Sequence, residues 1–330
     1  MASSAYEEAL QGWVISDGRR GIENQALGLA EASARLRPFS FTKHILTPGR
    51  AFKAATPLMQ FALKNRPADY GLPRETPDLV IGCGRQAIAA LLAIKKTIPT
   101  CFTVYIQDPK IDPDRFDLVI APQHDNLSGR NVENMIGSPN RVTRDGIVKE
   151  TLAFETTLNR FPMPRAALLI GGPSKRFQFT EADHRNHIRA AKDLLSKGFS
   201  LLITLSRRTP DWVQKEYSDL AKSNDKIWLH TGDGENPYFA FLGGAELILV
   251  TEESTNMLTE AAATGKPVFT LPLSGDSGKF KNLHEALSDM CNLRPYSGDP
   301  VAPDYPPLNE TARLADKLWA HYDRRDAILN

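Results

Sequence analysis

The sequence predicts an α/β protein built from two doubly wound domains, and three observations support this. Short apolar runs, each long enough for one strand, alternate with stretches whose apolar residues recur at helical spacing. The alternation starts again after "RFPMPR", residues 160–165, whose two prolines mark a linker. A chain of 330 residues is also long enough for about two domains.

Strands separated by helices predict parallel βαβ units in both halves. Helices are placed where apolar residues recur three or four positions apart, as Leu27, Ala30 and Ala34 do. In the first half, strands are expected at Gly12–Ile15, His44–Leu46, Leu79–Ile81, Phe102–Ile106 and Leu118–Ile120, with helices at Glu23–Arg35 and Gln86–Lys96. In the second half, strands are expected at Ala167–Ile170, Leu201–Leu205, Ile227–Leu229, Leu247–Val250 and Val268–Leu271, with helices at Glu181–Lys197, Pro210–Ser223 and Leu258–Thr264.

The domain boundary is expected near residue 163. We therefore expect an N-terminal domain over 1–163 and a C-terminal domain over 164–308, facing each other across a cleft. The tail 309–328 has Leu314, Leu318 and Tyr322 on one helical face, so it can pack back onto the first domain.

Composition and charge exclude several classes of protein. Apolar residues make up 42% of the chain, charged residues 24%, and the net charge is +1, which does not suggest a nucleic-acid binder. The three cysteines show no zinc-like spacing, and Cys83 and Cys101 are expected as core thiols. No leader-like N-terminus and no apolar run of membrane-spanning length are found, so a cytoplasmic location is expected. Contact with a membrane surface is left open.

Polar loops follow the predicted strands, and ligands of open parallel sheets bind beyond the carboxyl ends of the strands. "GGPSKRF" follows Ile170, "SRRTP" follows Leu205, and "TEESTN" follows Val250. Glycine amides and basic side chains suit phosphate oxygens, although plain turns with solvated charges would look the same. The residues expected to bind a phosphate or diphosphate group here are Gly171, Gly172, Ser174, Lys175, Arg207, Arg208, Ser254, Thr255 and Asn256.

Glu260 lies one turn into the helix that follows this last loop, where it can accept hydrogen bonds from ribose hydroxyls. The block "AELILVTEESTNMLTEAAATGKPVFTLPL" resembles the donor-binding segment of two-domain GT-B glycosyltransferases, which consist of Rossmann-like domains. It looks most like the lipid-linked N-acetylglucosamine transferase of peptidoglycan synthesis. That resemblance implies that Glu260 binds ribose and that residues 254–256 face the diphosphate. Glu252 and Glu253 depart from the pattern, because two carboxylates would repel a diphosphate unless they point away or bind a metal.

A resemblance to another family covers almost the whole chain. The motifs "WVISDGRRGIENQALGLAEA", "QDPKIDPDRFDLVIAPQHD", "GGPSKRF", "LSRRTP" and "GDGENPYFAFLGGAELILVTEESTNMLTEAAATGKPV" are similar to the mitochondrial-fission "elongated mitochondria" family. Its bacterial members are described as glycosyltransferases or nucleoside-diphosphate-sugar enzymes, and its plant members are associated with recruiting a dynamin-related protein. No motif in this chain carries that recruiting role.

The first half is expected to hold the acceptor, which is unknown and could be lipid-linked or anionic. Asp17 and His124 follow predicted strands, so they are the candidates for a general base. A turn residue and a hydrogen-bonded loop histidine are the alternatives for these two positions. The residues placed on the acceptor side are Arg19, Arg20, Gln107 and Asp108. A nucleotide-diphosphate sugar is expected as donor, with no cofactor assigned and no metal required, although Glu252, Glu253 and Asp233 leave a metal-assisted version open.

Two rival functions are left open. Gly82-x-Gly84-x-x-Ala87 follows a predicted strand, as in nicotinamide-dependent epimerases and dehydrogenases, but it lies on the third strand and no Tyr-x-x-x-Lys pair accompanies it. A non-enzymatic adaptor that keeps the fold without the chemistry is the other rival. The nucleotide base, sugar, acceptor, stereochemical course and oligomeric state are not determined by the sequence.

Overall fold

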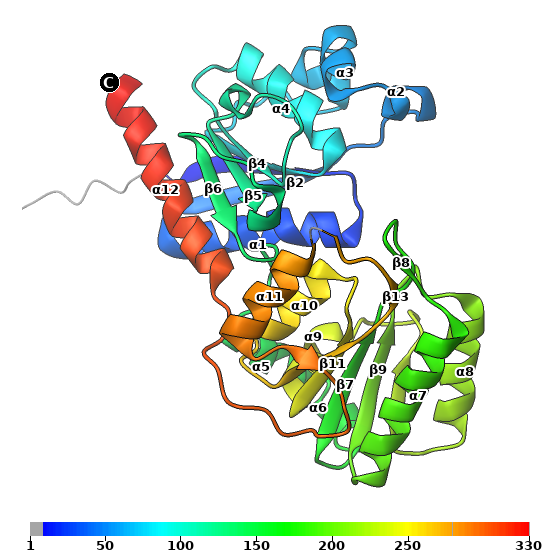
Figure 1. The fold of residues 1–330 in the computed structure, drawn as a ribbon. Coiled ribbons are helices and arrows are strands. Elements are labelled where there is room, and N and C mark those ends of the chain that lie inside the picture. The colour runs from blue at the N-terminus through cyan, green and yellow to red at the C-terminus, as the bar shows by residue number, and fades with distance from the viewer. Residues whose placement is uncertain (1–8, 279, 330) are drawn as a thin grey trace, which may run out of the picture. The chain divides into compact units, whose positions relative to one another are not determined.

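The computed structural model describes residues 9–278 and 280–329 (Figure 1). Residues 1–8, which include most of the N-terminal stretch considered above, lie outside the described residues. The chain divides into two compact units. The first domain takes the described residues up to Arg141 and those from Asn309 onward, and the second domain is Val142–Leu308.

The first domain is a six-stranded parallel sheet with the order β2-β1-β3-β4-β5-β6. The chain therefore runs outward from β1 in two directions, and the order reverses between β1 and β3. Ligands of such sheets bind at this reversal, beyond the carboxyl ends of the strands. The strands are β1 (Leu10–Ser16), β2 (Phe39–Ile45), β3 (Leu79–Cys83), β4 (Phe102–Ile106), β5 (Leu118–Pro122) and β6 (Val132–Met135).

Helices cover both faces of this sheet. On one face α1 and α12 pack against Val14, Ile81 and Val104, and on the other face α4 packs against Ile15 and Tyr105. The last helix, α12, lies against α1 and β6 in the same domain (Figure 1). The helices are α1 (Arg20–Leu36), α2 (Arg50–Ala54), α3 (Pro57–Leu63), α4 (Arg85–Thr97) and α12 (Glu310–Leu329), with 3₁₀ turns at Pro67–Tyr70, Pro113–Arg115 and Gln123–Asp125.

The second domain is also a six-stranded parallel sheet, with the order β10-β9-β7-β11-β12-β14. Its order reverses between β7 and β11, so the loops after these two strands are neighbours at the expected binding edge. The strands are β7 (Arg165–Ile170), β9 (Ser200–Leu205), β10 (Ile227–His230), β11 (Leu247–Thr251), β12 (Val268–Leu271) and β14 (Arg294–Pro295), with a separate antiparallel pair of β8 (Phe177–Gln178) and β13 (Ser274–Gly275).

On one face of this sheet α7 and α8 bury Leu194 and Tyr217, and α9 packs on β7 and β9. Nearly every residue of the strands β7, β9 and β11 is buried, which explains their continuous apolar runs. The helices are α5 (Arg144–Ala153), α6 (Glu155–Leu158), α7 (Glu181–Ser196), α8 (Asp211–Lys222), α9 (Tyr238–Gly244), α10 (Thr255–Ala262) and α11 (Phe280–Cys291).

The two-domain α/β prediction is confirmed, with differences in detail. The second strand is Phe39–Ile45 rather than His44–Leu46. The second compact unit begins at Val142 rather than near residue 163, because α5 packs against α9 of the second domain. These helices approach so closely at Gly243 that a Cβ there would lie 2.0 Å from the Thr151 hydroxyl oxygen. All three cysteines are buried.

Candidate functional site

The carboxylate of Glu253, in the loop after β11, packs against the glycine loop after β7 and accepts a hydrogen bond from it. The amide of Gly172 donates to Glu253 Oε1 at 3.0 Å, and the amide of Gly171 donates to Thr251 Oγ1 at 2.8 Å. A Cβ on Gly171 would lie 1.8 Å from Glu253 Oε1. The close approach that these glycines permit is therefore used by the β11–α10 loop, and the Gly172 amide has an internal anion as its acceptor.

Arg208 completes this contact. Its Nη2 lies 3.0 Å from Glu253 Oε1, and its Nη1 donates to the carbonyls of Gly172 and Pro173. The Glu253 side chain is 0% exposed, and burial raises its pKa while the Gly172 amide and Arg208 oppose the shift. Glu252 is likewise engaged, since its Oε1 accepts from the Leu273 amide at 2.7 Å. Groups of the protein thus bind Oε1 of each of the two carboxylates that depart from the transferase-like pattern.

Loss of Arg208 from this ion pair should destabilise the protein more than loss of Glu253. Arg208→Met leaves a buried carboxylate without its cation, whereas Glu253→Gln leaves a guanidinium that is 47% exposed to water. We expect Arg208→Met to lower the free energy of unfolding by about 2 kcal/mol and Glu253→Gln by less than about 1 kcal/mol. Urea denaturation followed by circular dichroism measures both. Equal losses would contradict this assignment of the buried partner.

The rest of "GGPSKRF" forms a tight turn rather than a helix start. Ser174 Oγ accepts from the amides of Arg176 and Phe177, and the chain then enters β8. The next helix, α7, begins only at Glu181 and is capped by Thr180 with Asp183. No helix start therefore follows the glycines directly. Lys175 and Arg207 are exposed on neighbouring loops of this edge.

The N-terminus of α10 lies across the order reversal from the glycine loop. Ser254 occupies the N-cap position, but its side chain makes no capping hydrogen bond. The first backbone bond of the helix runs from the Leu258 amide to the Ser254 carbonyl, so the amides of the preceding turn point out of the helix start. Such amides together with the helix dipole favour an anion.

Glu260 is buried inside α10 and bonded to Tyr238. The residue is 5% exposed, and the Tyr238 hydroxyl donates to Glu260 Oε2 at 2.6 Å. Burial raises the pKa of Glu260 to about 7, against the opposing effect of the Tyr238 bond. Sequence reasoning missed Tyr238 as a site residue. Its only signal was its place in the motif "GDGENPYFAF", where it opens α9.

In the first domain, the expected base and acceptor-side residues follow strands at the carboxyl edge of the sheet, and Asp17, Gln107 and Asp108 bond to nearby side chains of the same domain. Asp17 accepts from Arg19 Nε at 2.9 Å and its side chain is 10% exposed. Asp108 pairs with Lys110. Gln107 has a φ of 95°, which is uncommon outside glycine, and its Nε2 donates to Gln25 at 3.4 Å. Arg20 is the first residue of α1.

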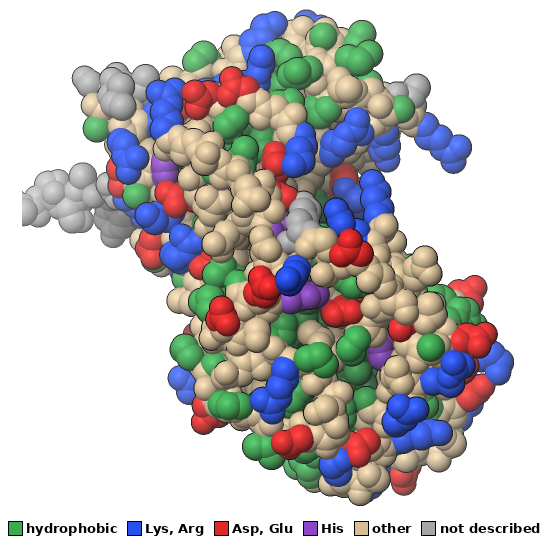
Figure 2. Space-filling view, viewed as in Figure 1, with side chains coloured by type: hydrophobic (Ala, Val, Ile, Leu, Met, Phe, Trp, Pro, Cys, Tyr) green, Lys and Arg blue, Asp and Glu red, His purple; other side chains and the backbone are tan. Residues whose placement is uncertain are grey.

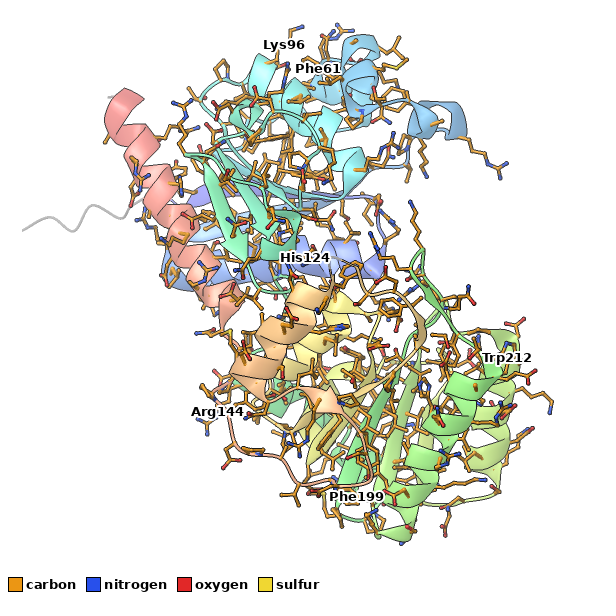
Figure 3. The ribbon with its side chains drawn as sticks, viewed as in Figure 1. Phe61, Lys96, His124, Arg144, Phe199 and Trp212 are labelled. Atoms are coloured by element: carbon orange, nitrogen blue, oxygen red, sulfur yellow. The ribbon has the colours of Figure 1, made fainter. Side chains whose placement is uncertain are left out.

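His124 and the small residues of the Gly-x-Gly-x-x-Ala motif are all buried in the first domain. His124, labelled in Figure 3, follows β5 in a 3₁₀ turn and is only 7% exposed. A Cβ on Gly82 would lie 2.6 Å from Leu91, and one on Gly84 would lie 2.8 Å from Ile22. The Gly-x-Gly-x-x-Ala motif therefore lets α1 and α4 pack closely on β3.

Other sites give no competing candidate. Within residues 9–278 and 280–329, no three His, Cys, Asp or Glu side chains are grouped to hold a metal, and no helix is both long and apolar enough to cross a bilayer. A hollow of about 270 Å³ lined by Arg160, Phe161 and Asp225 lies at the amino-terminal edge of the second sheet, away from the edge described above.

Similarity to solved structures supports the fold. The chain is similar to a protein from Listeria monocytogenes whose name assigns it to the UDP-N-acetylglucosamine 2-epimerases, with a TM-score of 0.58 and 14% identity, covering 96% of both chains. It is also similar to the glycosyltransferase of kitacinnamycin, with a TM-score of 0.50 and 13% identity, covering 96% of this chain and 91% of that one. At these identities the likeness shows the fold, which is that of GT-B glycosyltransferases and related epimerases.

Sequence comparison identifies the family. The chain is 26% identical over 272 residues to the mitochondrial fission protein ELM1 of Arabidopsis thaliana, a match that covers 74% of this chain and 64% of the plant protein. It therefore spans less than two thirds of that relative. The model of the family described as Mitochondrial fission ELM1 matches residues 20–322. The chain belongs to the Mitochondrial fission ELM1 family.

Proposed function

We propose that the second domain binds a nucleotide-diphosphate sugar at the carboxyl edge of its sheet and that the protein transfers the sugar to an acceptor. The observation that carries this proposal is the start of α10, where a helix without a side-chain cap lies at the order reversal of the sheet. A diphosphate would accept hydrogen bonds from the first-turn amides of α10, with Ser254, Thr255 and Asn256 around it. Arg207 and Lys175 would add positive charge from the neighbouring loops.

Glu260 would bind the ribose of the nucleotide in this proposal. When ionised, its carboxylate offers only acceptor oxygens and so accepts from ribose hydroxyls most strongly, and Tyr238 already donates to one of these oxygens. We therefore propose that Tyr238 orients Glu260 for the nucleoside. The names of fold relatives support this donor class, because the Listeria relative is named for a UDP-sugar.

Glu253 has a supporting role in this proposal. Because its carboxylate already neutralises Arg208 and binds the Gly172 amide, the glycine loop is held in place without a ligand. Gly171, Gly172 and Arg208 would then shape the site, and Arg207 would be the guanidinium that contacts the diphosphate. Asp17 and His124 stay proposals for the base, with Arg19, Arg20, Gln107 and Asp108 beside the acceptor.

Thermal unfolding with a panel of nucleotides tests the donor. We expect UDP, GDP or TDP, or one of their sugar conjugates, to raise the melting temperature, and NADH to leave it unchanged. Arg207→Ala should weaken that nucleotide about tenfold, the effect of one charge-assisted hydrogen bond. Arg185→Ala, which removes an exposed arginine of α7, is the matched control. No response to any nucleotide would overturn the proposal and favour a non-enzymatic role.

Product analysis then separates the possible reactions. Incubation of the protein with the stabilising sugar nucleotide should release nucleoside diphosphate, with transfer to added acceptors or slow transfer to water. Epimerised sugar nucleotide would instead indicate the chemistry for which the Listeria relative is named. Binding without any product would fit a protein that uses the nucleotide only as a structural ligand.

A further inference from the structure

The segment α2–α3 of the first domain presents an apolar face to solvent. Leu58 is 42% exposed, Met59 57% and Leu63 72%, and all three come from the same short helix, α3. Isolated exposed apolar residues are ordinary, but three on one helix form a contiguous face. We call these three side chains the α3 face.

Buried polar contacts hold the α3 face in place. The Gln60 side chain is 0% exposed and its amide donates to the carbonyls of Phe52 at 2.7 Å and Ala55 at 3.2 Å. Arg85 reaches from α4 to the carbonyls of Lys53 and Ala55. Phe61, on the opposite side of α3, packs against the core near α4 (Figure 3). These contacts hold the segment against the first domain, with Leu58, Met59 and Leu63 on its exposed side.

Most charges around this face are positive, although Arg66 lies 3.8 Å from the carboxylate of Asp69. Residues 50–66 contain Arg50, Lys53, Lys64 and Arg66 and no acidic residue. All four are exposed, and among the described residues no carboxylate pairs with Arg50, Lys53 or Lys64. Hydrophobic side chains gather over α3 with Lys and Arg side chains beside them (Figure 2). A partner for this surface must offer apolar contact and negative charge together.

We propose that the α3 face docks the first domain on a lipid bilayer that contains anionic headgroups. Leu58, Met59 and Leu63 would enter the boundary between headgroups and acyl chains, while the four cations would contact the phosphates and carboxylates above it. A bilayer surface supplies both kinds of contact without a matching groove, which a seven-residue helix could not fill. The proposal is independent of the nucleotide site, because it uses only residues of α2, α3 and their flanks.

Co-sedimentation with vesicles tests this inference. The whole protein should bind vesicles of phosphatidylcholine mixed with phosphatidylserine at least tenfold better than vesicles of phosphatidylcholine alone, and high salt should release it. Leu58→Ser with Met59→Ser and Leu63→Ser should reduce binding at least tenfold. Lys53→Glu with Lys64→Glu should do the same without touching the apolar residues, which guards against loss through misfolding of α3.

A matched control comes from the second domain. Val148 and Leu152 on α5 are 52% and 60% exposed, and replacing both by serine should leave vesicle binding unchanged. Circular dichroism and the melting temperature check that every variant is folded. Absence of binding by the wild-type protein, or equal binding by the variants, would overturn the proposal. Self-association that the α3 variants abolish, with no binding to vesicles, would assign the face to a second copy of the chain instead.

Discussion

Gly172→Ala should destabilise the second domain by about 3 kcal/mol, the upper part of the range for overpacking a buried position. A Cβ at this position would lie 2.1 Å from the carbonyl oxygen of Arg208 and 2.8 Å from the amide nitrogen of Thr209. Both contacts are with backbone, so no rotation of a side chain can relieve them. The loops after β7 and β9 must then separate, which also pulls the Gly172 amide from Glu253.

Chemical denaturation combined with hydrogen exchange measures this effect. Exchange should accelerate in β7 and β9, while the strands of the first domain keep their protection. Gly49→Ala is the matched control, because nothing lies within 4 Å of its Cβ position, and it should change stability by no more than about 0.5 kcal/mol. If Gly172→Ala were as stable as Gly49→Ala, the close contact between these two loops would be wrong.

Long apolar runs were the part of the fold that sequence reasoning could predict. Strands such as Leu247–Thr251 and Arg165–Ile170 are buried along their whole length, and burial on both faces of a parallel sheet leaves a continuous apolar signal. The strands β6 and β14 were missed because they are short and partly polar at the sheet edges. The second strand was predicted at the wrong residues because Ser40–His44 of β2 are exposed or half-buried, so this segment has no continuous apolar run.

The sequence predicted which loops form the candidate site but not which of their residues bond to one another. The rule that ligands lie beyond the carboxyl ends of parallel strands selected the loops after β7, β9 and β11 correctly as neighbours. It could not show that Glu253 would fill the glycine loop, because this bond joins residues 81 positions apart. The same holds for Tyr238 and Glu260, whose bond depends on how α9 and α10 pack. The sequence alone does not show which of its distant residues pair in the fold.

Glu260→Gln should remove a pH-dependent contribution of about 3 kcal/mol to the free energy of unfolding. In the folded protein, burial raises the pKa of Glu260 from 4.5 to about 7. Folding therefore favours the protonated acid, and the wild-type protein keeps this stability below the unfolded pKa of 4.5 and loses it as the pH rises through about 7. Glutamine fits the same site, accepts from Tyr238 and does not titrate. Relative to wild type, the variant should therefore gain stability between about pH 5 and about pH 8.

Urea denaturation of the variant and the wild-type protein at about pH 5 and about pH 8 measures this difference in the free energy of unfolding. Glu285→Gln, which alters a 59% exposed glutamate of the same domain, should show no comparable change between them. Tyr238→Phe supplies the converse test, because the tyrosine hydroxyl stabilises the ionised carboxylate and its loss should raise the pKa of Glu260 further. Nucleotide affinity should follow the same titration and rise with pH through about 7, since the ionised carboxylate accepts more strongly from ribose hydroxyls than the acid does. A pH-independent difference between Glu260→Gln and wild type would show that this carboxyl is not desolvated by α10.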